Sequence, residues 1–234
     1  MRATLFDEVG IAKGMKVLEL GCGTGVVARQ LAHIVGPTGH VVAVDCFQRI
    51  LDYAKRIGGV HGGAPIEYMM GEAETFAGMS GFDAVIAMTL LGCVESVPKV
   101  IANMSARAKP GGMVMVFDQD YESLIFDHSD VKLTRKIVDF GAMYNIRNPT
   151  VGRTLAAEMV RSKVKDVGCW GWVYTERDAG SYMITLADRY AQLAIEHDVV
   201  SKDVAEKWLA EIQTRGREGT FFASINYYCS WGHT

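Results

Sequence analysis

The sequence predicts an α/β fold with a seven-stranded, mostly parallel sheet, helices on both faces and a helical insertion before the last strand. Three observations carry this prediction. Five short apolar runs alternate with segments of helical period in the first half of the chain. A glycine-rich turn follows the first run, and two further β-rich runs lie in the more helical second half. Continuous apolar runs separated by helices are typical of a buried parallel sheet.

The first half contains the five expected parallel strands. They are Lys16–Leu20, Val41–Asp45, Ile66–Met70, Asp83–Met88 and Met113–Phe117. Apolar residues at helical spacing follow these runs, as in Val27, Leu31 and Ile34, and the stretches Gly36–Gly39 and Lys109–Gly112 predict breaks. The pattern therefore alternates strand and helix from residue 16 to residue 117.

The second half is more helical. Apolar stripes predict helices around residues 133–144, 155–160 and 184–197, and Trp170–Thr175 predicts a sixth strand. We expect Ser201 to cap a further helix, whose apolar face carries Val204, Trp208 and Ile212. Phe221–Tyr228 predicts the last strand.

We expect a single domain over residues 1–234. The chain shows no internal repeat, low-complexity tract or linker, and 234 residues suffice for one large domain. Within it, residues 11–120 would form a cofactor-binding half and residues 121–234 an acceptor-side half.

Composition narrows the classes of partner. The 24 basic and 27 acidic side chains give a formal charge of −3 without a basic stripe, which argues against a nucleic-acid partner. The start of the chain does not resemble a signal peptide, and no run approaches the roughly 18 apolar residues of a membrane helix, so we expect no membrane association. The cysteines are scattered, without a C-x-x-C pair, and favour a cytoplasmic protein with neither disulfides nor a metal site: Cys22, Cys46, Cys93, Cys169 and Cys229.

The turn after the first strand is the most informative segment. Gly21, Gly23 and Gly25 would let the backbone approach a ligand in front of the following helix. The dinucleotide fingerprint would need glycine at position 26, where Val26 stands. Asp45 ends the second strand, from which a carboxylate accepts hydrogen bonds from ribose hydroxyls. The site is therefore expected to hold a nucleoside.

These residues resemble the class I S-adenosylmethionine-dependent methyltransferases, which have a Rossmann-like fold. The matching segments are Val17–Gly25, Val41–Asp45, Gly71–Ala73, Phe82–Ile86 and Lys109–Gly112. The resemblance is strong over about residues 11–120. The remainder is similar, less specifically, to the ubiquinone/menaquinone-biosynthesis type of small-molecule methyltransferase, in which a stretch like Asn148–Arg153 leads the penultimate helix.

The resemblance implies S-adenosylmethionine as the cofactor and assigns roles to its site. The glycine loop would pack against the methionine portion, with Glu19 near the ammonium group. Asp45 would accept from the ribose hydroxyls, and Glu72 from the adenine amino group. The implied cofactor residues are Glu19, Gly21, Cys22, Gly23, Gly25, Asp45, Cys46, Phe47, Gly71, Glu72, Ala73, Met88 and Thr89.

The sequence defines the binding site of the methyl acceptor less well, because methyl transfer from a sulfonium mainly requires that donor and acceptor are aligned. Candidate catalytic residues are Asp118 and Asp120 in an acidic turn after the fifth strand, His128 beyond it, and His197 on an apolar helix side, where core packing is the alternative. The Asn/Asp-Pro-Pro-Tyr/Phe turn of base-amino methyltransferases is absent. Thr89 stands where catechol-type enzymes need an acid, so no metal is expected.

The chain before the first strand is short for a roof over the acceptor pocket. We therefore expect the two-helix insertion at residues 179–216 to act as a lid, alone or with a second subunit in a homodimer.

The sequence thus predicts methyl transfer from S-adenosylmethionine to an oxygen, nitrogen or carbon atom of a small-molecule acceptor. One alternative is an S-adenosylmethionine-binding protein without methyl transfer, either a regulator or a rearrangement catalyst. A nicotinamide oxidoreductase is disfavoured by Val26, and a nucleic-acid methyltransferase by the charge balance.

Overall fold

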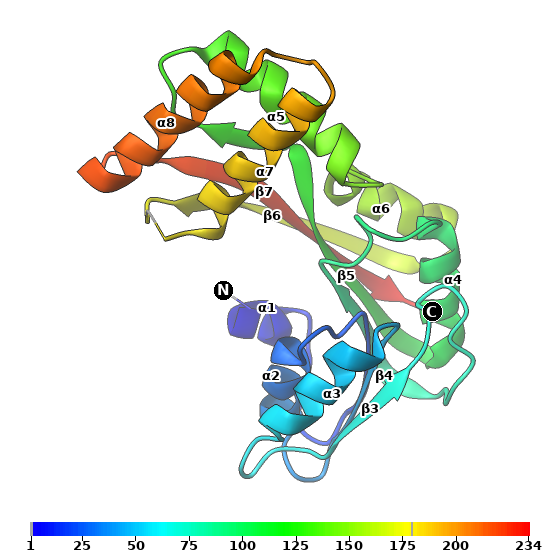
Figure 1. Ribbon diagram of the computed structural model, residues 1–234. Helices are drawn as coiled ribbons and strands as arrows, with labels where there is room; N and C mark the ends of the chain where they lie inside the picture. The colour runs from blue at the N-terminus through cyan, green and yellow to red at the C-terminus, as the bar shows by residue number, and fades with distance from the viewer. Residues whose placement is uncertain (1, 179) are drawn as a thin grey trace. The chain divides into compact units, whose positions relative to one another are not determined.

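The computed structural model describes residues 2–178 and 180–234 (Figure 1). One seven-stranded sheet has the strand order β3-β2-β1-β4-β5-β7-β6, with β7 antiparallel, and this confirms the predicted fold class. The strands are β1 (Lys16–Leu20), β2 (His40–Asp45), β3 (Ile66–Met70), β4 (Phe82–Met88), β5 (Ala108–Phe126), β6 (Lys165–Glu176) and β7 (Ala223–His233). The helices are α1 (Arg2–Glu8), α2 (Val26–Val35), α3 (Gln48–Ile57), α4 (Val97–Arg107), α5 (Val131–Asn145), α6 (Val151–Arg161), α7 (Tyr182–Glu196) and α8 (Lys202–Glu218).

The chain forms two compact units. Unit 1 comprises Met1–Asp118, Thr154–Trp170 and Cys229–Thr234, and unit 2 comprises Gln119–Arg153 and Gly171–Tyr228. The strands β5, β6 and β7 each contribute residues to both units. The division into a cofactor half and an acceptor half stays a prediction.

Unit 1 contains the parallel part of the sheet. β1 pairs in parallel with β2 and β4, β2 with β3, and β4 with β5. Figure 1 shows α2 and α3 on one face of these strands and α4 on the other. The strands β1, β2 and β4 are almost wholly buried, which explains their continuous apolar sequence. Parallel pairing brings the carboxyl ends of β1, β2 and β4 to one edge, so the turns that follow them meet there.

Strand β5 is much longer than the sequence indicated, and the acidic turn predicted after Phe117 is wrong. The strand continues through Asp118 and Asp120 to Phe126. Tyr121, Leu124 and Phe126 are buried in the core of unit 2, and this burial offsets the cost of carrying acidic residues in a strand. The break predicted at Lys109–Gly112 lies inside β5, where the register against β4 is irregular.

Unit 2 is built around an aromatic and aliphatic core beneath α5, α7 and α8. Helix α7 packs against both α5 and α8. Trp208 is 1% exposed, its indole N–H donates to Thr134 Oγ1 at 2.9 Å, and its ring meets that of Phe126 edge-on. A fully buried Trp is stable only where its N–H finds an acceptor. This hydrogen bond therefore fixes the contact between α8 and α5.

The helices α7 and α8 lie where the two-helix insertion was predicted, apart from residue 179, which lies outside the described residues. Ser201 is the N-cap residue of α8, but its side chain makes no capping hydrogen bond there. One short helix, α1, precedes β1. A lid function for the insertion stays a prediction.

Candidate cofactor site and the predicted catalytic residues

A cavity of about 1000 Å³ lies in unit 1, beyond the carboxyl ends of β1, β2 and β4. Twelve of the thirteen predicted cofactor residues line it, and Gly25 is the exception. The other residues in its wall are Thr24, Val26, Val27, Ile50, Glu74, Thr75, Leu90, Cys93, Val94, Glu95, Ser96 and Lys99. The cavity is therefore built from the turns after β1, β2, β3 and β4.

The glycine loop is held against the end of β2 by hydrogen bonds that its backbone N–H groups donate to residues of that strand. The N–H groups of Gly21 and Cys22 donate to the carbonyl of Val44 at 2.8 and 2.9 Å. The N–H of Gly23 donates to Asp45 Oδ2 at 2.8 Å. All three loop glycines have positive φ, a conformation that other residues adopt only at a cost. The loop is thus tied down before any ligand binds.

Gly25 has a structural role that explains why it does not line the cavity. It is the N-cap of α2 with φ +74°, and a Cβ atom there would lie 2.5 Å from the hydroxyl oxygen of Tyr68 on β3. Arg29 lies beside the same hydroxyl and donates from Nη1 to the carbonyl of Thr24 at 3.0 Å. Burial raises the pKa of Tyr68. Tyr68 and Arg29 were not predicted from the sequence, because neither belongs to a glycine-loop motif.

Asp45 is 8% exposed and uses both carboxylate oxygens in backbone contacts. Oδ2 accepts from Gly23, and Oδ1 accepts from the N–H of Phe47 at 3.0 Å. A carboxylate offers about four lone-pair positions, so these bonds orient the group and leave it able to accept from a diol. Phe47 is 63% exposed and Cys46 is also exposed, so both are accessible beside Asp45.

The cavity has a predominantly acidic lining. Its carboxylates are Glu19, Asp45, Glu72, Glu74 and Glu95, against the single ammonium group of Lys99. Glu74 also accepts from the backbone N–H of Glu95 at 2.9 Å, which joins two of the lining turns. Clustered charges of one sign inside a cleft raise the local concentration of oppositely charged ligands. The cavity is therefore suited to a ligand that carries positive charge.

Thiols in the cavity are held in their neutral form. Burial raises the pKa of Cys22, and the charges of Glu19 and Asp45 add to that effect. Partial desolvation also raises the pKa of Cys46, although this thiol is exposed, and the charges of Glu72 and Asp45 add to the effect. These thiols are therefore weak nucleophiles near neutral pH, because the thiolate is the reactive species.

The turn after β4 is held in a strained conformation. Thr89 has φ +52°, which is exceptional for a β-branched residue. Its N–H donates to the carbonyl of Phe117 at 2.7 Å, and its hydroxyl donates to the carbonyl of Met88 at 2.8 Å. The side chain of Leu90 then lies against Gly21, where a Cβ atom would be 2.6 Å from Leu90 Cδ1.

Asp118, a predicted catalytic residue, contacts this turn. It is 1% exposed, and its Oδ2 accepts from the N–H groups of Leu91 at 2.7 Å and Gly92 at 3.2 Å. Asp120 is also buried but belongs to unit 2. It forms a two-point ion pair with Arg153, whose Nη2 lies 2.8 Å from Oδ1 and whose Nε contacts Oδ2. Arg153 also reaches Glu122 Oε2 at 3.0 Å, and the hydrogen bond to Asp120 raises its pKa.

The two predicted catalytic histidines also lie in unit 2. His128 is buried, its Nδ1 accepts from the N–H of Asp130 at 2.9 Å, and its Nε2 is 3.4 Å from Glu211 Oε2. His197 is exposed and directly follows α7, so the expectation that it lies on the apolar side of the helix was wrong. Its ring contacts Tyr144, with ring centroids 4.1 Å apart.

None of the four predicted catalytic side chains belongs to the described residues that line the unit 1 cavity. Asp118 and Asp120 are bonded to neighbouring parts of their own units, as is His128. A catalytic role for any of the four stays a prediction. Within residues 2–178 and 180–234, no group of three or more His, Cys, Asp or Glu side chains could hold a metal ion. No helix in the same ranges is long and apolar enough to cross a bilayer.

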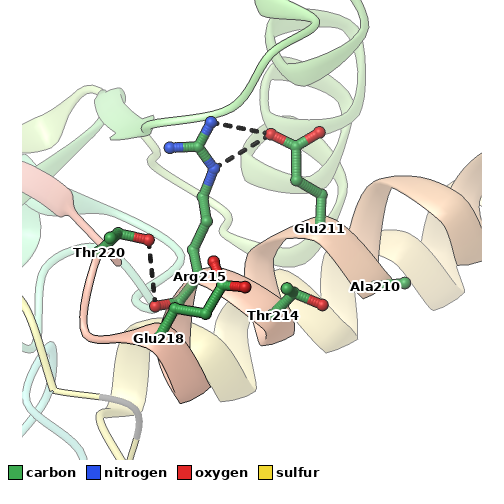
Figure 2. A pocket seen from close by; sticks show the side chains of 6 residues that line it. All are labelled: Ala210, Glu211, Thr214, Arg215, Glu218 and Thr220. Atoms are coloured by element: carbon green, nitrogen blue, oxygen red, sulfur yellow. Dashed lines mark hydrogen bonds and ion pairs between the residues drawn. The ribbon is translucent and has the colours of Figure 1, made fainter.

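A second hollow, of about 570 Å³, lies along the end of α8 in unit 2 (Figure 2). Two of its charged side chains, Glu211 and Arg215, form an ion pair with each other. Arg215 Nε donates to Glu211 Oε1 at 3.0 Å, as Figure 2 shows, and Arg215 Nη1 is 2.7 Å from Asp127. A hydrogen bond from the Ser129 hydroxyl, helped by the Ser129 N–H and by Arg215, lowers the pKa of Glu211 to about 2. Because these contacts hold α8 in place within unit 2, we interpret the hollow as part of the packing of α8 and not as a ligand site.

Comparison with known proteins agrees with this fold. The family model described as "Methyltransferase domain" matches residues 11–192. The chain therefore belongs to this family of methyltransferase domains. The resemblance stated from the sequence motifs is confirmed.

Individual relatives are distant. A 37.1 kDa protein of transposon Tn4556 from Streptomyces fradiae is 24% identical over 97% of this chain and 65% of its own length. The ubiquinone/menaquinone biosynthesis C-methyltransferase UbiE of Haemophilus ducreyi is 36% identical over 52% of this chain and 47% of its own length. The chain thus spans less than two thirds of either relative. The crystal structure of the YcgJ protein from Bacillus subtilis has a TM-score of 0.67 over 99% of this chain and 97% of its own, with 13% identity, and this likeness concerns the fold alone.

Proposed function

We propose that this methyltransferase binds S-adenosylmethionine in the unit 1 cavity and transfers its methyl group to a small-molecule acceptor by in-line displacement. The observation that carries the proposal is the single cavity that brings twelve of the predicted cofactor residues together. In this arrangement Asp45 accepts from the ribose hydroxyls, and Glu72 accepts from the adenine amino group. Glu19 lies near the methionine ammonium, and Met88 and Thr89 line the wall near the sulfonium.

The charge of the cavity supports this choice of ligand. S-adenosylmethionine carries a sulfonium and an ammonium against one carboxylate, whereas its product, S-adenosylhomocysteine, has no sulfonium charge. Five lining carboxylates against one lysine favour the charged donor. The exposed ring of Phe47 beside Asp45 offers a face for the adenine base.

Three observations support a small-molecule acceptor. The chain has a net charge of −3 and no basic stripe with which to hold a phosphate backbone. The turn after β4 reads Thr89-Leu90-Leu91-Gly92 and lacks the Asn/Asp-Pro-Pro-Tyr/Phe pattern. The UbiE relative is named for a biosynthetic reaction on ubiquinone or menaquinone, although the match covers about half of each chain.

Calorimetric titration with S-adenosylmethionine, S-adenosylhomocysteine and NADH tests the cofactor part. We expect both adenosyl ligands to bind, NADH not to bind, and Asp45→Ala to abolish the binding. Asp203→Ala is the matched control, because Asp203 is exposed on α8 and pairs only with Lys207 among the ion pairs of the described residues. Binding of NADH alone, or equal affinity in Asp45→Ala, would contradict the proposal.

The acceptor part is tested by transfer of a labelled methyl group from S-adenosylmethionine. The panel contains quinols, phenols, primary amines and carboxylic acids, with total RNA and duplex DNA as the macromolecular arm. We expect label only in the small-molecule arm. Label in RNA or DNA, lost at raised salt concentration, would overturn the assignment of acceptor class.

A further inference from the structure

We propose that Asp118 is a positioning residue, which shapes the cofactor cavity by holding the turn after β4 in its strained conformation. The inference deepens the proposed function, since it rests on binding of S-adenosylmethionine in that cavity. In this proposal Asp118 accepts hydrogen bonds from two backbone N–H groups and does not act as a base.

The geometry of the carboxylate supports this role. Oδ2 of Asp118 accepts from both Leu91 and Gly92, at 2.7 and 3.2 Å, and the group is 1% exposed. Hydrogen bonds from backbone N–H groups to a buried carboxylate are charge-assisted and about twice as strong as neutral ones. Asp118, in the middle of β5, is thereby bonded to the two residues that follow Leu90.

The turn requires such a restraint because its first residue is strained. Thr89 has φ +52°, and a residue in such a region stays there only when its surroundings determine it. The bond from the Thr89 N–H to Phe117 holds one side of the turn, and Asp118, the next residue of β5, holds the other. Two consecutive residues of β5 therefore fix the turn.

The consequence lies at the glycine loop. With the turn fixed, Leu90 packs where a Cβ atom on Gly21 would stand, and both Thr89 and Leu90 line the cavity. Leu90 therefore closes the cavity wall between the turn after β4 and the loop after β1. A change at Asp118 would move this wall without any contact between Asp118 and the ligand.

Three substitutions separate the position of the oxygen from its charge. Asp118→Asn keeps an oxygen that can accept from both N–H groups but removes the charge. Asp118→Glu keeps the charge but moves the oxygens by one methylene group. Asp118→Ala removes the acceptor. We expect wild-type affinity for S-adenosylmethionine within about threefold in Asp118→Asn, and a loss of roughly tenfold or more in the other two, given the strength of hydrogen bonds to charged groups.

The matched control is Asp83, at the start of β4 in the same unit. Its Oδ2 accepts from the backbone N–H of Lys16 at 2.7 Å, and its Oδ1 contacts Lys109. Asp83→Ala should lower the melting temperature and leave the affinity for S-adenosylmethionine unchanged. Hydrogen exchange should be faster at Leu91 and Gly92 in Asp118→Ala and Asp118→Glu, but not in Asp83→Ala.

Coupling to Leu90 completes the test. If Asp118 acts through Leu90, Leu90→Ala lowers affinity by itself, and adding Asp118→Glu lowers it little further. Loss of binding in Asp118→Asn as severe as in Asp118→Glu would overturn the proposal, as would wild-type affinity in a folded Asp118→Glu. Failure of the wild-type protein to bind S-adenosylmethionine would instead contradict the proposed function. If Asp118→Ala does not fold, the affinities of Asp118→Asn and Asp118→Glu for S-adenosylmethionine still test the proposal.

Discussion

Gly23 and Gly25 stand two residues apart in one loop, and both have positive φ, yet their surroundings differ. A Cβ atom on Gly23 would meet nothing within 4 Å, whereas one on Gly25 would lie 2.5 Å from the Tyr68 hydroxyl and 3.1 Å from Arg29. Gly23 is therefore required only by its backbone conformation. Gly25 is required both by its backbone conformation and by the close approach of Tyr68 and Arg29.

This difference gives a prediction for the unliganded protein. Gly23→Ala should cost only the left-handed backbone, about 1–2 kcal/mol. Gly25→Ala should cost that amount plus the displacement of Tyr68 and Arg29, about 1–3 kcal/mol more. Urea unfolding of both variants measures the difference. Equal midpoints would show that Tyr68 and Arg29 move away freely.

The reactivity of the Cys93 thiol can be used to detect the charge of Asp118. Burial raises the pKa of Cys93, and the charge of Asp118 adds to it. Asp118→Asn should lower that pKa and speed alkylation of Cys93 at pH 8, because the thiolate is the reactive species. Cys46, whose pKa is raised by burial, Glu72 and Asp45 without Asp118, is the internal control. Mass spectrometry of the alkylated peptides gives both rates, and an unchanged rate at Cys93 would contradict the assignment.

Among the secondary-structure elements of unit 2, α5 and α7 pack closely against each other at Gly141. A Cβ atom on Gly141 of α5 would lie 2.3 Å from Cγ of Tyr190 on α7, and Tyr190 is fully buried. Glycine weakens a helix interior, so its presence in α5 is explained by this contact. Because Gly141 has no side chain, α5 can pack directly against the buried ring of Tyr190 on α7.

A double-mutant cycle tests this contact. Gly141→Ala should destabilise the protein by about 1–3 kcal/mol through overpacking, although alanine forms helices better. In a Tyr190→Leu background the same substitution should be neutral or stabilising. The free energy of unfolding of the four proteins gives the coupling, and additivity would contradict it.

Helix α8 is joined to the segment before α5 by Glu211. The Ser129 hydroxyl and N–H donate to it, and its pKa of about 2 lies below the unfolded value of about 4.3. Because the folded-state pKa is lowered, this contribution to stability is present above about pH 5 and is lost as the pH falls toward 2.

Glu211→Gln should therefore show a smaller loss of stability between pH 6 and pH 3 than the wild-type protein. Urea midpoints at several pH values measure the effect. Glu206→Gln is the control, since Glu206 is exposed on the same helix. If Glu211→Gln and wild type lose stability in parallel, Glu211 does not carry this part of the acid sensitivity.

At the scale of the whole molecule, the cavity residues all belong to unit 1. We expect saturating S-adenosylmethionine to slow hydrogen exchange most in the lining turns, at residues 19–27, 45–50, 71–75 and 88–96, since ligand binding suppresses local opening. Mass spectrometry of peptides measures this. The strongest slowing in unit 2 would contradict the proposed site. The same data test the predicted lid, because unchanged exchange in α7 and α8 with cofactor and acceptor both bound would contradict it.

The parallel strands and the turns that line the cavity could be predicted from the sequence, because both depend on local patterns. Apolar runs mark buried strands, and glycines mark the loop in front of α2. The extension of β5 was not predictable in this way, since its residues are held by contacts distant in sequence: Leu124 and Phe126 are buried in the core of unit 2, and Asp120 pairs with Arg153, 33 residues away. The roles of Tyr68 and Asp118 likewise depend on contacts between separate turns and strands, and a single sequence carries no signal for them.

The shared strands have a consequence for synthesis on the ribosome. Unit 1 is completed by Cys229–Thr234, and the N–H of Thr234 donates to the carbonyl of Gly112 at 3.1 Å. Because unit 1 includes residues 229–234, it cannot finish folding until these residues have left the exit tunnel. All of unit 2 is translated before the nascent chain has a complete unit 1.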